Sequence, residues 1–192
     1  MKLILASSSP RRAEILRDAG FAFDSIPAHV DETRWPQEKP VQLVLRLAKA
    51  KAEAATWRAA PPCIIVGGDT EVVLDGDVFG KPVGEEDARA MLQRLSGRTH
   101  EVITGLHALR LPEQEFRSEH EITRVTFAPL SGQEIEDYVT TGEPFDKAGA
   151  YAIQGWAGRF VTRVDGCYFN IVGLPLARLY RILRDLGFDK IS

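Results

Sequence analysis

Two adjacent arginines, Arg11 and Arg12, follow a run of three serines and a proline near the start of the chain. The proline opens a predicted helix, so both guanidinium groups fall in its first turn. Free N–H groups make that end of a helix positive, and a cation there is disfavoured by about 0.3–1 kcal/mol. A bound phosphate would explain the pair, because each guanidinium can grip two phosphate oxygens. The alternative is that they point into solvent or pair with Glu14 or Asp18.

Three acidic residues stand where they could hold a metal ion or take a proton from water. Asp69 follows two glycines after the apolar run CIIV, and we expect it at the carboxyl end of that strand, where α/β proteins place ligands. The glycines would leave room for a bulky group. Asp31 and Glu32 are adjacent at the start of a polar loop. Such carboxylates can act as a general base or bind a metal. The alternatives are a turn carboxylate bonded to neighbouring N–H groups and a solvated pair of surface acids.

Two other segments carry candidate ligand groups. Lys81 follows a predicted hairpin in FGKP, which lacks the glycine spacing and the Ser or Thr of a P-loop. The segment 146–155, DKAGAYAIQG, is rich in small residues that permit close approach to a ligand, and Gln154 offers both a donor and an acceptor. Its alternative role is a tight connection between strands.

Other catalytic patterns are missing from the sequence. The four histidines show no zinc spacing, and no serine lies in a GxSxG elbow. The candidate groups are therefore arginines, lysines and carboxylates. A site of this kind suits phosphate chemistry with a divalent ion, in which catalysis consists of positioning and charge neutralisation.

The elements that must position these groups mix helices and strands without strict alternation, which predicts an α/β fold with a mixed sheet. The loop 31–40 is polar and contains two prolines. Asp75-Gly76-Asp77 predicts a hairpin turn. We expect strands over 2–6, 21–28, 63–68, 71–74, 78–79, 100–111, 117–128 and 160–164, and helices over 10–19, 41–57, 85–95, 131–141 and 174–186.

The helix over 41–57 has an apolar stripe with helical spacing. Lys49 and Lys51 flank the stripe on a helical wheel, and Arg46 lies on the far side, so the wheel leaves open which lysine faces a site. The stripe consists of Val41, Val44, Leu45, Ala48, Ala52 and Ala55.

Composition limits the class of protein. The chain has 192 residues, a net charge of −3 and 44% hydrophobic residues, which predicts a single domain over 1–192 with two lobes. The acidic balance argues against nucleic-acid and membrane-surface partners. No apolar run is long enough for a membrane span or a signal peptide. The two cysteines, Cys63 and Cys167, fit a reducing cytosol.

Taken together, the motifs resemble the Maf family of nucleoside triphosphate pyrophosphatases. The resemblance covers nearly the whole chain. The motifs occur in the family's order: LILASSSPRR, VDET, GGDT, GKP, LSGRTHEVITG, DKAGAYAIQG and VGLPL.

The resemblance implies a cytoplasmic housekeeping hydrolase that converts a nucleoside triphosphate to the monophosphate and pyrophosphate with Mg²⁺ or Mn²⁺. It implies a mixed sheet flanked by helices, as in inosine triphosphatase-like proteins, with a cleft between two lobes, and a homodimer.

The resemblance also assigns roles to residues. Asp69 matches the general base and Glu32 the acid near the metal, so these two carboxylates are the expected metal ligands. Lys51 and Lys81 match catalytic cations around the triphosphate, which favours Lys51 over Lys49. The expected substrate-binding residues are Ser7, Arg11, Arg12, Thr70 and Gln154.

One family subgroup, which acts on dTTP and UTP, carries arginine, threonine and glutamine at the positions of Arg11, Thr70 and Gln154. The subgroup that acts on 7-methyl-GTP carries an aromatic residue, glutamine and glutamate there. This chain has the first set, and a neutral amide suits the acceptor–donor–acceptor edge of thymine or uracil. We therefore expect dTTP and UTP, or modified forms of these pyrimidine nucleotides, as substrates. The alternatives are a pyrophosphatase for modified purine nucleotides and a nucleotide-binding regulator of septum formation.

Overall fold

The computed structural model describes residues 1–189, which form two compact units. The first unit comprises Met1–Asp69, Thr104–Glu121 and the described residues from Gly173 onward. The second comprises Thr70–Ile103 and Ile122–Val172. Each unit has its own set of buried apolar residues.

Seven strands pair in the order β2-β1-β3-β5-β6-β7, with β4 paired to β3. β1 pairs in parallel with β2 and β3, whereas β3–β4 and β6–β7 are antiparallel, so the sheet is mixed, as predicted. The strands are β1 (Lys2–Ala6), β2 (Asp24–Ser25), β3 (Cys63–Leu74), β4 (Asp77–Phe79), β5 (Thr99–Leu111), β6 (Glu115–Phe127) and β7 (Val161–Asp165).

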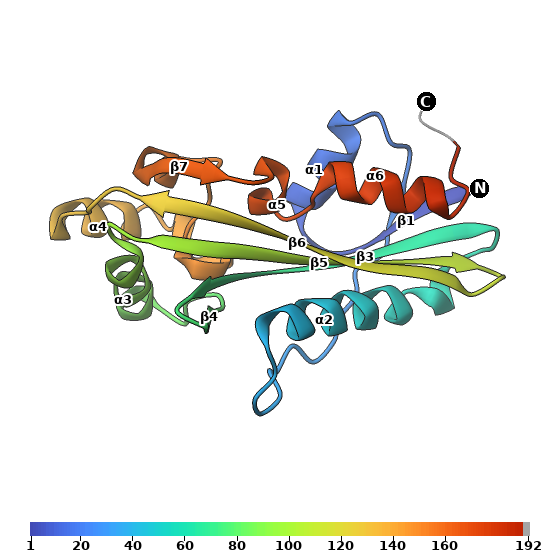
Figure 1. The fold of residues 1–192 in the computed structure, drawn as a ribbon, viewed down its shortest axis with the longest axis horizontal. Helices are drawn as coiled ribbons and strands as arrows, with labels where there is room; N and C mark the ends of the chain where they lie inside the picture. Colours follow the sequence, from blue (N-terminus) through green and yellow to red (C-terminus); the bar gives the residue numbers. More distant parts are fainter. Residues whose placement is uncertain (190–192) are drawn as a thin grey trace. The chain divides into compact units, whose positions relative to one another are not determined.

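Three helices cover the strands of the first unit: α1 (Pro10–Asp18), α2 (Pro40–Ala54) and α6 (Leu176–Asp185), and a 3₁₀ turn, Thr56–Arg58, follows α2. In Figure 1, α2 lies on one face of these strands, and α1 and α6 lie on the other. The backbone of α2 comes unusually close to the sheet. A Cβ atom at Gly67 would lie 2.1 Å from the Ala48 carbonyl oxygen, and one at Gly105 would lie 2.3 Å from that of Val44. Only glycine permits this approach.

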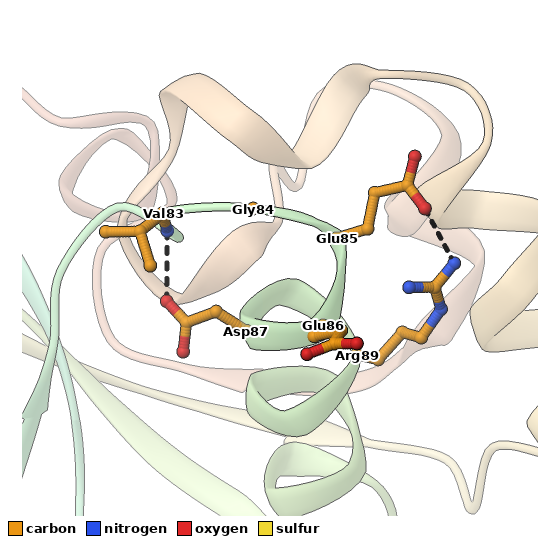
Figure 2. A pocket seen from close by; sticks show the side chains of 6 residues that line it. All are labelled: Val83, Gly84, Glu85, Glu86, Asp87 and Arg89. Carbon is orange, nitrogen blue, oxygen red and sulfur yellow. Dashed lines mark hydrogen bonds and ion pairs between the residues drawn. The ribbon is translucent and has the colours of Figure 1, made fainter.

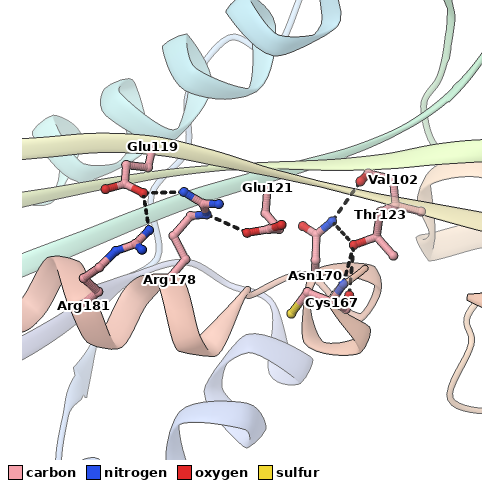
Figure 3. A network of polar contacts seen from close by, with 8 residues as sticks. All are labelled: Val102, Glu119, Glu121, Thr123, Cys167, Asn170, Arg178 and Arg181. Carbon is pink, nitrogen blue, oxygen red and sulfur yellow. Dashed lines mark hydrogen bonds and ion pairs between the residues drawn. The ribbon is translucent and has the colours of Figure 1, made fainter. Parts of the chain in front are cut away.

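Ion pairs attach α6 to β6 within the first unit (Figure 3). The Arg178 guanidinium donates to Glu119 at 2.5 Å and to Glu121 at 2.6 Å. Arg181 donates to the same Glu119 carboxylate at 3.1 Å. The arrangement fixes the helix on the strand through charge-assisted bonds as well as apolar packing.

The second unit contains α3 (Glu85–Leu95), α4 (Gly132–Val139), the short α5 (Tyr168–Val172) and 3₁₀ turns at Glu143–Asp146, Ala148–Ala150 and Trp156–Phe160. The helices α3 and α4 lie side by side (Figure 1), and Arg89 joins them through a two-bond pair with Glu136. Aromatic side chains dominate the core, with edge-to-face contacts among Phe127, Tyr138, Tyr151 and Phe160.

A buried amide attaches α5 to the strands of the second unit (Figure 3). Asn170 donates to the Val102 carbonyl and to the Thr123 hydroxyl, each at 2.9 Å. The same hydroxyl donates to the carbonyl of Cys167 and accepts from its N–H. Sequence reasoning missed α5 because five residues are too few to show a helical period.

Three other sequence predictions need correction. The strand expected over 21–28 is only Asp24–Ser25, because Pro27 has no N–H with which to extend the pairing. The glycines of GGDT do not end a strand, since β3 runs without interruption from Cys63 to Leu74. The buried face of α2 includes Leu43 and Leu47, whereas Val41 and Leu45 of the expected stripe are half-buried.

The remaining elements agree with the prediction to within a few residues. The turn between β3 and β4 has left-handed backbone angles at Asp75 and Gly76, as a tight hairpin requires. Within residues 1–189, no helix combines the length and the apolar content that a membrane crossing needs.

Candidate active site

The candidate site of the first unit lies where β1 ends and β3 continues. In the parallel pairing of these strands, Ala6 stands beside Gly67, so the turn after β1 lies next to Gly68 and Asp69. The prediction that Asp69 ends its own strand is wrong, because Asp69 is in the middle of β3. It lies instead beyond the carboxyl end of β1, the neighbouring strand.

Arg12 is buried and held in place by two acceptors. Its Nε donates to the Gly173 carbonyl at 2.7 Å, and its Nη1 donates to the Ser7 hydroxyl at 3.3 Å. The Ser7 hydroxyl also accepts the Ser9 N–H at 3.1 Å, so it orders the turn before α1. A Cβ atom at Gly68 would lie 3.5 Å from Arg12 Nε, so the guanidinium packs against this glycine.

Burial lowers the pKa of Arg12, the nearby Asp69 carboxylate opposes that effect, and the neighbouring Arg11 adds to it. The guanidinium remains charged at any physiological pH. An anion bound beside Arg12 would therefore meet a cation whose desolvation has already taken place on folding.

Arg11 is half-buried in the same helical turn. Within residues 1–189 it forms no ion pair with Glu14 or Asp18. The alternative that its guanidinium points into solvent stays open, and its role as a phosphate ligand stays a prediction.

Lys51 joins the two predicted carboxylates. Its ammonium lies 2.6 Å from Glu32 Oε1 and 2.6 Å from Asp69 Oδ1. The side chains of Lys51 and Asp69 are 10% and 8% exposed, whereas that of Glu32 is 57% exposed. The helical wheel had left two lysines open, and the structure selects Lys51, because Lys49 is exposed and pairs with Glu53.

The second carboxylate oxygen of Asp69, Oδ2, is buried without a hydrogen bond to any of the residues described. A buried carboxylate oxygen in that state is costly unless a water, an ion or a ligand contacts it. Asp69 therefore presents one oxygen fixed by Lys51 and one available for chemistry.

These carboxylates fit a divalent cation. Mg²⁺ usually takes one or two protein carboxylates and completes its coordination with waters and substrate phosphates. Glu32 and Asp69 converge on one ammonium, and the unpartnered Oδ2 is a further donor. Within residues 1–189, no group of three or more His, Cys, Asp or Glu side chains is placed to hold a metal alone, so phosphate or water oxygens would have to complete the set.

Thr70, Lys81 and Gln154 belong to the second unit. Lys81 and Gln154 are exposed, and Thr70 is half-buried. The backbone after Gln154 is held by Glu143, whose Oε2 accepts the Trp156 N–H and whose Oε1 accepts the Tyr138 hydroxyl, each at 3.1 Å. Gln154 is thus presented from an anchored segment.

A pocket of about 450 Å³ lies at the start of α3 in the second unit. Figure 2 shows Asp87 accepting the Val83 N–H and Arg89 donating to Glu85. Three carboxylates and one guanidinium line it, and no predicted site residue is among the lining residues. Its acidic lining would repel a triphosphate, so we do not assign the substrate to it.

Sequence comparison assigns the chain to a family. A model of the family described as "Maf-like protein" matches residues 2–186. The chain belongs to the Maf-like family. The resemblance inferred from the motifs is thereby confirmed.

Relatives named dTTP/UTP pyrophosphatase match nearly the whole chain. A dTTP/UTP pyrophosphatase of Carboxydothermus hydrogenoformans is 47% identical over 188 residues, which are 98% of this chain and 100% of the relative. One of Koribacter versatilis is 52% identical over 97% of this chain and 95% of the relative. One of Aquifex aeolicus is 45% identical over 97% of this chain and 96% of the relative.

The fold is shared more widely. The Ham1 protein of Staphylococcus aureus matches 97% of this chain and 100% of its own, with a TM-score of 0.54 and 14% identity. This likeness of fold confirms the predicted α/β class.

Two features of the site escaped sequence reasoning. The Gly173 carbonyl that receives Arg12 lies in the motif VGLPL, which was noted only for its place in the family pattern. The buried Glu38 and its partner Arg46 gave no signal, because an acid beside a lysine and an arginine on the far side of a helical wheel both suggest solvent.

Proposed function

We propose that this chain is a nucleoside triphosphate pyrophosphatase that converts dTTP and UTP to the monophosphate and pyrophosphate. Membership of the Maf-like family and the activity named for three relatives at 45–52% identity support the reaction class. The observation that carries the mechanism is the buried Asp69 carboxylate, with one oxygen held by Lys51 and the other unpartnered.

The first unit supplies the groups for the phosphates. Arg11 and Arg12 neutralise and orient phosphate oxygens at the start of α1, where free N–H groups add positive potential. Ser7 holds Arg12 in place and offers its own hydroxyl to the substrate. Lys81, in the second unit, is proposed as a further cation for the triphosphate.

Asp69 is the proposed general base. Its Oδ2 accepts a proton from a water molecule whose oxygen then bonds to phosphorus at the α–β anhydride. The bridging P–O bond breaks, and pyrophosphate leaves with the electron pair. Lys51 fixes the other Asp69 oxygen, so the basic oxygen keeps its direction during the reaction.

Glu32 and Asp69 are the residues that would hold Mg²⁺ or Mn²⁺, Asp69 through water, so that its Oδ2 remains the base. When bound, such an ion would supply neutralisation of charge on the phosphate oxygens. Glu32 is the more exposed of the two carboxylates.

Thr70 and Gln154 are the proposed readers of the base. A carboxamide both donates and accepts, which matches the edge of thymine or uracil, whereas a carboxylate would only accept. We expect the enzyme to work as a homodimer on the cytoplasmic nucleotide pool, including modified pyrimidine nucleotides.

Pyrophosphate release tests this function. The purified chain is assayed with dTTP, UTP, GTP and 7-methyl-GTP, with EDTA or with added Mg²⁺ or Mn²⁺. We expect release from dTTP and UTP that requires the metal. Preference for the guanine nucleotides would support the purine alternative, and binding without release would support a regulatory protein.

A further inference from the structure

We propose that Glu38 and Arg46 are positioning residues that hold the loop 31–38 so that its Glu32 carboxylate reaches Lys51 and Asp69. The inference concerns how the catalytic carboxylates are arranged, and it rests on the proposed function for its kinetic part. We call the Glu38–Arg46 pair and its contacts the loop clamp.

The centre of the clamp is an ion pair with two hydrogen bonds, largely shielded from solvent. Arg46 Nε donates to Glu38 Oε1 at 2.6 Å, and its Nη2 donates to Oε2 at 2.9 Å. The Glu38 side chain is 6% exposed and that of Arg46 is 19% exposed. The hydrogen bonds from Arg46 hold the pKa of Glu38 below its usual range, so the acid is ionised at neutral pH.

The side chains of Arg46 and Glu38 also bond to backbone groups of the loop, and the Arg34 side chain adds a third bond. Arg46 Nη2 also donates to the Thr33 carbonyl at 3.0 Å. Glu38 Oε2 accepts the Trp35 N–H at 3.1 Å, and the Glu38 carbonyl accepts Arg34 Nε at 2.8 Å. The Arg46 guanidinium lies 4.2 Å from the centre of the Trp35 ring. Residues on both sides of the loop bend are therefore fixed to one point of α2.

The clamp acts next to Glu32 in the chain, because Arg46 donates to the carbonyl of the following residue, Thr33. An ion pair of an exposed carboxylate contributes little, so the pair of Glu32 with Lys51 gives only weak support to the position of the loop. Arg46 and Lys51 both belong to α2, so the clamp and the receiving ammonium share one rigid helix. This geometry supplies the order that Glu32 needs before substrate binds.

Kinetics on single and double variants test the clamp. Arg46→Met keeps an apolar side chain against Trp35 but removes the guanidinium group that donates to Glu38 and to the Thr33 carbonyl. Because Glu32 would be misplaced, we expect kcat to fall about 10-fold or more with a smaller change in KM. If Arg46 acts through Glu32, adding Arg46→Met to Glu32→Gln lowers kcat no further. Effects that multiply in the double variant would overturn the proposal.

Limited proteolysis gives a readout that does not depend on activity. Trypsin can cut the exposed loop after Arg34, whereas Lys39 is protected by the following Pro40. We expect cleavage after Arg34 to be several-fold faster in Arg46→Met and in Glu38→Gln than in the wild type. An unchanged rate in both variants would show that the clamp does not order the loop.

Two further variants are controls: one for the effect of breaking any similar ion pair, and one for misfolding of Arg46→Met. Arg89→Met breaks a pair of the same geometry with Glu136, far along the chain in the second unit, and should change neither kcat nor cleavage after Arg34. Arg46→Lys keeps a charge beside Glu38 if Arg46→Met fails to fold, and it should show a smaller loss of kcat together with a milder change in cleavage. If the wild type hydrolyses no nucleotide, the proposed function fails while the cleavage rates still decide the clamp.

Discussion

The two units bury polar groups in different ways. In the described part of the chain, the buried charged side chains are Arg12, Glu38, Lys51 and Asp69, and all four belong to the first unit. The buried polar side chains of the second unit are His100, Thr123 and Asn170. Burial lowers the pKa of His100 to about 4, so it is neutral at pH 7.

The difference reflects what each unit must do. Buried charge is costly unless an opposite charge or a ligand accompanies it. The first unit pairs Lys51 with Asp69 and Arg46 with Glu38, which suits the binding and cleavage of an anion. The second unit keeps its interior neutral, and burial raises the pKa of Tyr138 and Tyr151. A neutral interior is compatible with the base-reading role that we propose for Gln154 in this unit.

The strongest test of the comparison is Asp69→Asn. We expect kcat to fall by about 10²-fold or more for every nucleotide, because the general base is lost while the amide keeps the size of the side chain. Circular dichroism should show that the variant is folded. The control is Asp77→Asn, which alters an exposed carboxylate paired with Arg94 in the β4 hairpin. Turnover by Asp69→Asn at the wild-type rate would exclude Asp69 as the base.

The neutral interior of the second unit predicts acid sensitivity. The His100 pKa is about 4 in the folded chain and about 6.5 in the unfolded chain. The unfolded state therefore takes up the proton first as pH falls. The contribution of neutral His100 to the free energy of unfolding is fully present above about pH 6.5 and decreases progressively down to about pH 4. Between pH 7 and pH 5 the free energy of unfolding falls by about 2 kcal/mol.

Urea unfolding at several pH values measures this loss. The His100→Gln side chain can still form a hydrogen bond with the Tyr151 hydroxyl. In this variant the free energy of unfolding should change less with pH over that range than in the wild type. His29→Gln replaces an exposed histidine and is the control. An unchanged slope in His100→Gln would mean that another group causes the acid sensitivity.

A change in the second unit should alter substrate choice rather than turnover in general. Gln154→Glu replaces the proposed base reader by a group that only accepts hydrogen bonds. We expect the ratio of kcat/KM for dTTP over GTP to fall about 10-fold, which corresponds to about 1.4 kcal/mol. Gln114→Glu, in the turn between β5 and β6, is the control. A ratio that does not move would remove Gln154 from base recognition.

The smallest effect is expected from an exposed ion pair. Arg89→Met removes the link between α3 and α4, and exposed pairs of this kind contribute about 1 kcal/mol or less. Thermal unfolding should show a small decrease in Tm with no change in kcat for dTTP. A large kinetic effect would show that the pocket of Figure 2 takes part in catalysis.

Local features followed from the sequence because nearby residues decide them. Asp75-Gly76 formed the expected hairpin turn, since left-handed angles favour Asp and Gly. Ser131 and Glu134 formed the capping box of α4. The residue types indicated the candidate charges, and the resemblance of several motifs in order to a known family indicated the family, which the family match confirms.

Contacts between distant residues required the tertiary structure. Arg12 bonds to a carbonyl 161 positions away, and the burial of Glu38 depends on which face of α2 Arg46 occupies. The glycines of GGDT resembled a strand end, but Gly67 serves the close approach of α2, so Asp69 lies inside β3. The sequence by itself thus determined which charged groups and turns are present. Only packing decided which of them are buried together, because burial depends on partners that local sequence does not specify.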